Sequence, residues 1–176
     1  MVDALDKNFA RLCSQLIVNC EKKSIIMVPF EKLRTPKIQA NYWVQGRSQE
    51  QIDEKVNELK EAQALFLAEC LAQAKIKDGP IISNALPGCS WHQFGEAVDC
   101  YWLRDGYPCW DLEAKDTNNQ NGYEIYANEA KILGLEAGFY WRTFRDSVHV
   151  QLQSYSSPLE LYSIVEIDAV MKDFYD

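Results

Sequence analysis

The sequence predicts an α+β fold in which helices flank a small, mostly antiparallel sheet, with one long helical segment in the first half. Hydrophobic residues change between helical and strand-like spacing along the chain, in the order helix, strand, helices, strand, helix, strands, helix. This order favours an α+β domain over a parallel α/β sheet. The chain has 176 residues, 47% of them hydrophobic, and can therefore bury a substantial core without disulfides.

Four segments of the N-terminal half have regular spacing. They are a helix at 3–22, a strand at 24–29, a second helix at 36–44 and a long helical stretch at 48–77. Thr35 is the expected cap of the second helix, and Pro36 at its first position has the φ angle that a helix requires. Ser48 and Gln51 form a capping-box pattern for the long stretch, which is either one helix or two joined by a kink.

The C-terminal half alternates between loops, strands and helices. We expect a loop at 84–95, a strand at 97–103 and an irregular excursion at 104–122. A helix at 124–136, two strands at 139–144 and 148–152 and a final helix at 157–176 follow. The strand 97–103 directs Val98 and Asp99 to opposite faces of the sheet, and Gly95 permits a tight turn before it. Ser157 and Pro158 are expected to open the final helix.

Charge and hydropathy exclude several classes of function. The net charge of −8 argues against nucleic acid and against anionic membrane surfaces, which require clustered Lys and Arg. No segment approaches the roughly 20 apolar residues of a membrane span. The N-terminus lacks the pattern of a secretory signal. We therefore expect that the protein is made in the cytoplasm, that the numbering starts after a signal has been removed, or that the protein leaves by a route without a cleaved signal.

No two of the six cysteines form a CxxC pair, which argues against a zinc ribbon and against a thioredoxin-like motif. We expect most of them to be reduced and buried. A bridge among Cys89, Cys100 and Cys109 stays open at this point.

The chain has only two histidines, His92 and His149, and each has a carboxylate nearby in sequence. His92 precedes Asp99 by seven residues, and Asp146 precedes His149 by three. Zinc favours imidazole nitrogen and carboxylate oxygen, and a catalytic site keeps three protein ligands with one open position. His92, Asp99 and His149 would supply such a set, which leaves Asp146 as a base; the alternative is that both histidines are core residues with hydrogen-bond partners.

These residues fall within a longer pattern, SxHxxGxAxD at 90–99 followed by DxxH at 146–149. It resembles the D-Ala-D-Ala metallopeptidase family, which includes VanY-type carboxypeptidases and the L-alanyl-D-glutamate endopeptidases of phage endolysins. Further segments that resemble the family, in family order, are LRTP at 33–36, GRS at 46–48, NALPG at 84–88 and GLE at 134–136. The resemblance implies a hedgehog/D-Ala-D-Ala-peptidase-like fold, in which the 48–80 region is a helical insertion into a single zinc peptidase domain over residues 1–176.

The resemblance also implies a role for each matching residue. The Zn²⁺ ligands would be His92, Asp99 and His149, and Asp146 would be the general acid/base. Arg34 would bind substrate and stabilise the oxyanion, and Ser90 and Gln39 would be further substrate-binding residues.

The function implied is a zinc-dependent peptidoglycan hydrolase that cuts the stem peptide, first of all at the L-Ala–D-Glu bond. The alternatives are a D,D-carboxypeptidase or D,D-dipeptidase acting on D-Ala-D-Ala termini, and a non-catalytic zinc-binding interaction domain of the same fold. Such an enzyme would act in the periplasm or cell wall, as an endolysin released through a holin or as an effector exported by a secretion apparatus. The apolar face of residues 48–77 is expected to pack on the domain's own core or to bind a partner protein.

Overall fold

The computed structural model describes residues 5–176 and divides the chain into two compact units. Unit 1 combines Met1–Leu33 with Phe94–Ser154, and unit 2 combines Arg34–Gln93 with Tyr155–Asp176. The predicted 48–80 region lies wholly in unit 2. That it is an insertion into one peptidase domain stays a prediction.

Unit 1 consists of an antiparallel sheet and two long helices. In chain order its elements are α1 (Lys7–Glu21), β1 (Ile26–Glu31), β2 (Ala97–Arg104), β3 (Tyr107–Cys109), α5 (Gly122–Ile132), β4 (Glu136–Ala137), the 3-10 helix η2 (Gly138–Tyr140) and β5 (His149–Gln151). The strand order is β1-β2-β5-β4, and β3 pairs with the far end of β2. Every strand pair is antiparallel, so the predicted α+β class with a small antiparallel sheet is confirmed.

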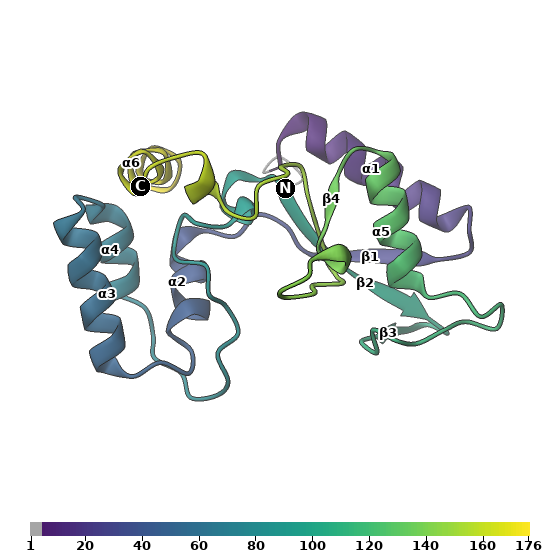
Figure 1. Ribbon diagram of the computed structural model, residues 1–176, viewed down its shortest axis with the longest axis horizontal. Coiled ribbons are helices and arrows are strands. Elements are labelled where there is room, and N and C mark those ends of the chain that lie inside the picture. The colour runs from purple at the N-terminus through teal and green to yellow at the C-terminus, as the bar shows by residue number, and fades with distance from the viewer. Residues whose placement is uncertain (1–4) are drawn as a thin grey trace. The chain divides into compact units, whose positions relative to one another are not determined.

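The two faces of this sheet differ. Helices α1 and α5 lie on the same side of β1 and β2 (Figure 1), and the core between them contains Val98, Cys100 and Trp102. Because side chains alternate along a strand, Asp99 and Tyr101 point to the opposite face, as predicted for Asp99. Strand β2 therefore has one face in the hydrophobic core and an opposite face that carries polar and aromatic side chains.

Two strand predictions in unit 1 need correction. The strand expected at 139–144 is wrong, because Gly138–Tyr140 forms a 3-10 helix and the strand in this region is the two-residue β4. The excursion at 104–122 contains the short strand β3, which was not predicted. The other predicted elements of unit 1 are present with bounds shifted by a few residues.

Unit 2 is helical. Its elements are α2 (Pro36–Val44), α3 (Gln49–Glu61), α4 (Leu65–Ala72), the 3-10 helices η1 (Trp91–Phe94, whose last residue belongs to unit 1) and η3 (Pro158–Glu160), and α6 (Ile164–Tyr175). The predicted cap at Thr35 and the capping box of Ser48 and Gln51 are both present. The long stretch is two helices, and it breaks where Gln63 adopts a φ of 64°.

The predicted final helix at 157–176 is also divided. Ser157 with Glu160 caps only the short η3, and a second capping box of Ser163 with Glu166 starts α6. Asp168 of α6 accepts a hydrogen bond of 2.8 Å from the backbone N–H of Leu67. This bond supplies a side-chain acceptor for the first turn of α4, because its N-cap Ala64 provides none.

Most apolar residues of the 48–77 segment are buried within the chain, although Leu65 is 56% exposed. Ile52, Val56 and Leu59 of α3 are at most 6% exposed, and Phe66, Leu67, Ala68, Cys70 and Leu71 of α4 are buried as well. Helix α4 packs against α2, α3 and α6 of its own unit. Packing within the unit accounts for most of this face, and a partner protein on it stays a prediction.

All six cysteines are free, and all except Cys109 are buried. The bridge among Cys89, Cys100 and Cys109 that the sequence left open is therefore not formed. Among the helices of residues 5–176, none is long and apolar enough to cross a bilayer.

Candidate metal centre

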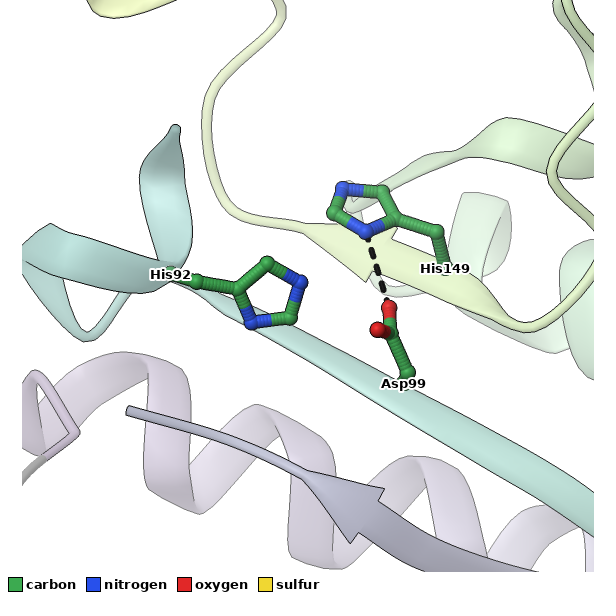
Figure 2. A group of neighbouring side chains, drawn as sticks. All are labelled: His92, Asp99 and His149. Carbon is green, nitrogen blue, oxygen red and sulfur yellow. Dashed lines mark hydrogen bonds and ion pairs between the residues drawn. The ribbon is translucent and has the colours of Figure 1, made fainter. Parts of the chain in front are cut away.

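The pairing of β2 with β5 brings Asp99 and His149 together. Asp99 is directly opposite His149 in the strand register, so both side chains project from the same face of the sheet. The Oδ1 atom of Asp99 lies 2.9 Å from Nδ1 of His149 (Figure 2). Both residues are less than 10% exposed.

His92 reaches the same place from the 3-10 helix η1, which directly precedes β2. Gly95 has a φ of 69°, a left-handed conformation that turns the chain from η1 into the strand, as predicted for this glycine. The imidazole of His92 points toward the carboxylate of Asp99 in Figure 2. One donor atom from each of His92, Asp99 and His149 lies within 4.8 Å of the other two. The structure thus brings together the three side chains that the sequence predicted as ligands.

The hydrogen bonds around His149 indicate that this group suits a cation. Nε2 of Gln151 donates to the carbonyl oxygen of Gln153 at 2.7 Å, which leaves Oε1 of Gln151 facing Nε2 of His149 at 2.9 Å. Nε2 of His149 is then the donor nitrogen, and its Nδ1 faces a carboxylate oxygen. Two acceptors would confront each other there unless a proton or a metal ion lies between them.

The pKa of His149 responds to this environment. Burial lowers the pKa, but the hydrogen bond and charge of Asp99, the charge of Asp146 and the hydrogen bond to Gln151 raise it above the usual value of 6.5 overall. Without a metal, a proton satisfies the pair of Asp99 and His149. With a metal, His92, Asp99 and His149 would hold the ion, since zinc takes imidazole nitrogen and carboxylate oxygen.

We expect Gln151→Ala to weaken zinc binding by roughly 10- to 100-fold, because it removes the acceptor that holds His149 in the tautomer with Nδ1 free. Competition with a chromogenic chelator measures the affinity, and the visible spectrum of the Co²⁺-substituted protein reports the ligand geometry. Gln151→Glu, which keeps an acceptor, should recover most of the affinity. Wild-type affinity in Gln151→Ala would contradict this role for the amide.

Asp146 is held beside His149 by backbone contacts. The N–H of His149 donates to the carbonyl oxygen of Asp146 at 3.2 Å, and the N–H of Asp146 donates to that of Gly138 at 3.0 Å. Its carboxylate is close enough for its charge to raise the pKa of His149. The predicted base and the predicted ligand therefore lie on one short segment fixed to η2.

Gly138 leaves no room for a side chain beside Asp146. A Cβ placed there would lie 2.5 Å from the carbonyl oxygen of Asp146 and 3.1 Å from its Cβ. We expect Gly138→Ala to displace Asp146 and to lower the peptidase activity that the sequence predicts at least about tenfold, because a small misplacement of a catalytic group has a large effect on rate. Initial rates on peptidoglycan, together with zinc content, check this expectation.

Gly106 offers a control for that substitution. Nothing lies within 4 Å of a Cβ at Gly106, although its φ of 83° makes any side chain there strained. Gly106→Ala should therefore lower the melting temperature without lowering activity. An equal loss of activity in both variants would mean that general destabilisation, not the position of Asp146, is responsible.

The other predicted site residues lie in unit 2, around a buried amide. Nη1 of Arg34 donates to Oε1 of Gln39 at 2.8 Å, and the backbone N–H of Arg34 donates to the carbonyl oxygen of His92 at 3.2 Å. Gln39 is fully buried, and its Nε2 donates to Ser83 and to the carbonyl oxygen of Ala85. These bonds support a role for Gln39 in orienting Arg34, whereas its direct contact with substrate stays a prediction.

Ser90 lies two residues before His92, where Gln93 holds the backbone. Oε1 of Gln93 accepts from the N–H of Ser90 at 3.2 Å, and the hydroxyl of Tyr175 donates to the carbonyl oxygen of Gln93 at 2.7 Å. Ser90 itself is half-buried. Its contact with substrate stays a prediction.

Sequence reasoning missed two residues that contact His149. Gln151 follows it by two positions on one strand, so the alternation of side chains could have placed both on the same face. The ring of Trp141 lies 5.1 Å from that of His149, centroid to centroid, and comes from the segment after η2 that was expected to be a strand. Trp141 follows the GLE segment that resembles the family, but spacing alone does not predict its contact with His149.

A comparison with protein families matches the part of the chain that contains this group. Residues 84–152 match a family model described as D-alanyl-D-alanine carboxypeptidase. The peptidoglycan L-alanyl-D-glutamate endopeptidase CwlK of Bacillus subtilis (strain 168) is 35% identical over 88 residues, which represent 48% of this chain and 52% of that protein. The chain thus spans about half the length of this curated relative.

Two solved structures are also similar. The L-Ala D-Glu endopeptidase ChiX of Serratia marcescens is 17% identical with a TM-score of 0.46, over 86% of this chain and 83% of that one. A mutant of the D,D-pentapeptidase VanY from the VanB-type vancomycin resistance cassette, solved in complex with Zn(II), is 19% identical with a TM-score of 0.37, over 98% and 84% of the two chains.

Proposed function

We propose, on the premise that this chain belongs to the D-Ala-D-Ala metallopeptidase family, that it is a zinc-dependent peptidoglycan hydrolase that cuts the stem peptide. The observation that carries the proposal is the convergence of His92, Asp99 and His149, with donor atoms within 4.8 Å and Asp146 three residues before the last of them. Two imidazoles and one carboxylate form a donor set typical of catalytic zinc.

His92, Asp99 and His149 would hold the zinc ion, and Asp146 would act as the general acid/base. A zinc ion bound there supplies Lewis acidity toward the scissile carbonyl and toward water. Asp146 accepts the proton of the attacking water and then donates a proton to the departing amine. Arg34 carries the positive charge that would stabilise the carbonyl oxygen as it becomes negative.

The first candidate for the cleaved bond is the L-Ala–D-Glu bond. The support is the 35% identity over 88 residues to a peptidoglycan L-alanyl-D-glutamate endopeptidase. The second candidate is a D,D-carboxypeptidase or D,D-dipeptidase, which the description of the matching family model favours.

Digestion of purified peptidoglycan by the zinc-loaded protein separates these candidates. New amino termini on D-Glu, identified by mass spectrometry of the released peptides, are the expected result. Release of free D-Ala or of D-Ala-D-Ala would establish the second candidate instead. No new terminus of either kind, at one zinc per chain, would leave the non-catalytic zinc-binding domain as the function.

The substrate also determines where the protein would work. Peptidoglycan lies outside the inner membrane, so we place the activity in the periplasm or cell wall, reached through a holin-type lesion or a dedicated secretion apparatus. Expression of the chain in the cytoplasm with and without a co-expressed holin tests this proposal, and lysis that requires the holin is the expected result.

A further inference from the structure

We infer that three aromatic side chains of unit 1, Phe30, Tyr101 and Trp110, form a subsite for the amino sugar that carries the stem peptide. This inference rests on the proposed function and specifies its substrate. The three rings are here called the aromatic cluster. Phe30 and Trp110 are 48% and 57% exposed, and Tyr101 is half-buried between β1 and the segment after β3.

The aromatic cluster is a built surface in which every ring touches the other two. The ring centroids are 5.4 Å apart for Phe30 and Trp110, 5.5 Å for Tyr101 and Trp110, and 6.1 Å for Phe30 and Tyr101. Phe30 is the unpaired residue of a bulge in β1, between Pro29 opposite Cys100 and Glu31 opposite Asp99. Bulges re-aim side chains, and here the re-aimed ring meets the other two.

The cluster adjoins the candidate metal centre on the same face of the sheet. Tyr101 follows Asp99 by two positions on β2, so their side chains share a face and lie about 6.6–6.8 Å apart along the strand. Both α1 and α5 pack on the other face. The aromatic cluster therefore lies in unit 1, on the same sheet face as Asp99 and its cross-strand partner His149.

The chemistry of the substrate identifies what would lie on these rings. In peptidoglycan, the L-Ala of the stem peptide is joined to the lactyl group of N-acetylmuramic acid. The L-Ala–D-Glu bond is then separated from the sugar by two extended units, roughly 7 Å at 3.3–3.6 Å per unit. A D-Ala–D-Ala bond is five units away, about 17 Å. Only the first distance is similar to the roughly 6.6–6.8 Å that separates Asp99 from Tyr101 along β2.

A sugar ring suits such a surface because its faces present C–H groups. These groups are apolar and slightly positive, and they stack on the negative face of an aromatic ring. Phe30, Tyr101 and Trp110 carry no formal charge, so the cluster contacts the sugar mainly by removing apolar surface from water. The proposed occupant is the N-acetylmuramic acid residue next to the scissile bond.

The test compares two substrates that have the same peptide. One is the disaccharide-tetrapeptide released from peptidoglycan, and the other is the free tetrapeptide. The zinc-loaded wild type should prefer the disaccharide-tetrapeptide by about tenfold in kcat/KM. Trp110→Ala should abolish most of this preference through KM, with an unchanged melting temperature, and Trp110→Phe should retain it.

Tyr107→Ala is the matched control, since Tyr107 is also an exposed aromatic residue of unit 1 but pairs with Arg104 and faces away from Tyr101. It should keep the wild-type preference. Titration with the peptide-free disaccharide of N-acetylglucosamine and N-acetylmuramic acid, followed by NMR, should show binding that Trp110→Ala removes.

Each outcome of the comparison has a separate meaning. Equal losses on both substrates in Trp110→Ala would assign the cluster to the peptide and overturn the sugar subsite, while the peptidase function stands. A wild type without preference for the disaccharide-tetrapeptide would also overturn it. Cleavage of neither substrate by the zinc-loaded wild type would overturn cleavage at the L-Ala–D-Glu bond and this inference together, and release of D-Ala from a pentapeptide would then establish the second candidate.

Discussion

Asp146→Ala is expected to leave one zinc per chain and to lower kcat by roughly 10²- to 10⁴-fold, the usual contribution of a general acid or base. Asp146 is not part of the three-residue donor group, so its removal does not subtract a ligand. It does remove the carboxylate that lies on the same short segment as His149 and influences its pKa. The measurement pairs turnover of a stem-peptide substrate with zinc content by atomic emission.

Two further variants sharpen this experiment. Asp146→Glu keeps a carboxylate and should retain a measurable fraction of the activity, whereas Asp173→Ala, at an exposed position of α6, should behave as the wild type. Wild-type turnover in Asp146→Ala would remove this residue from the mechanism. A wild type that holds one zinc per chain but does not cleave peptidoglycan would instead favour the non-catalytic zinc-binding alternative.

His92→Ala is expected to lose the metal and, with it, the activity. Structural zinc sites bind with about 10–16 kcal/mol in total, so one of three or four ligands accounts for roughly 3–4 kcal/mol, or 10²- to 10³-fold in affinity. Chelator competition measures the change in Kd. The fold should survive, since the strand pairing of Asp99 with His149 does not depend on His92.

Cys109→Ala provides the control for metal loss. It removes the least buried thiol, a potential zinc donor outside the three-residue group, and should retain one tightly bound zinc per chain. A His92→Ala protein that still holds one zinc with unchanged affinity would exclude His92 from the ligand set.

Local chemistry made most of the fold predictable. Thr35 and Ser48 cap helices where the sequence indicated, and the alternation of 97–103 gave a strand with the expected faces. The final helix was misjudged because two capping boxes lie six residues apart, Ser157 with Glu160 and Ser163 with Glu166. Spacing does not reveal which box begins the long helix, since that depends on packing of α6 against α4.

The site was predictable in part for a related reason. His92, Asp99 and His149 fall in a motif, so their convergence could be expected without knowing the strand register. The aromatic cluster could not be expected, because it requires the bulge at Phe30 and the pairing that brings β1 and β3 to the two edges of β2. Contacts of this kind depend on register, and a shift of one residue would send every side chain to the opposite face.

The buried thiols affect how the protein would tolerate different redox environments. Burial raises the pKa of Cys13, Cys20, Cys89 and Cys100 to about 12 and that of Cys70 to about 11. At neutral pH, only on the order of one thiol in 10⁴ to 10⁵ at such a site is the reactive thiolate, and the packed core blocks oxidants as well. We therefore expect the folded chain to form no crosslinks at these five positions in a reducing or in an oxidising solution.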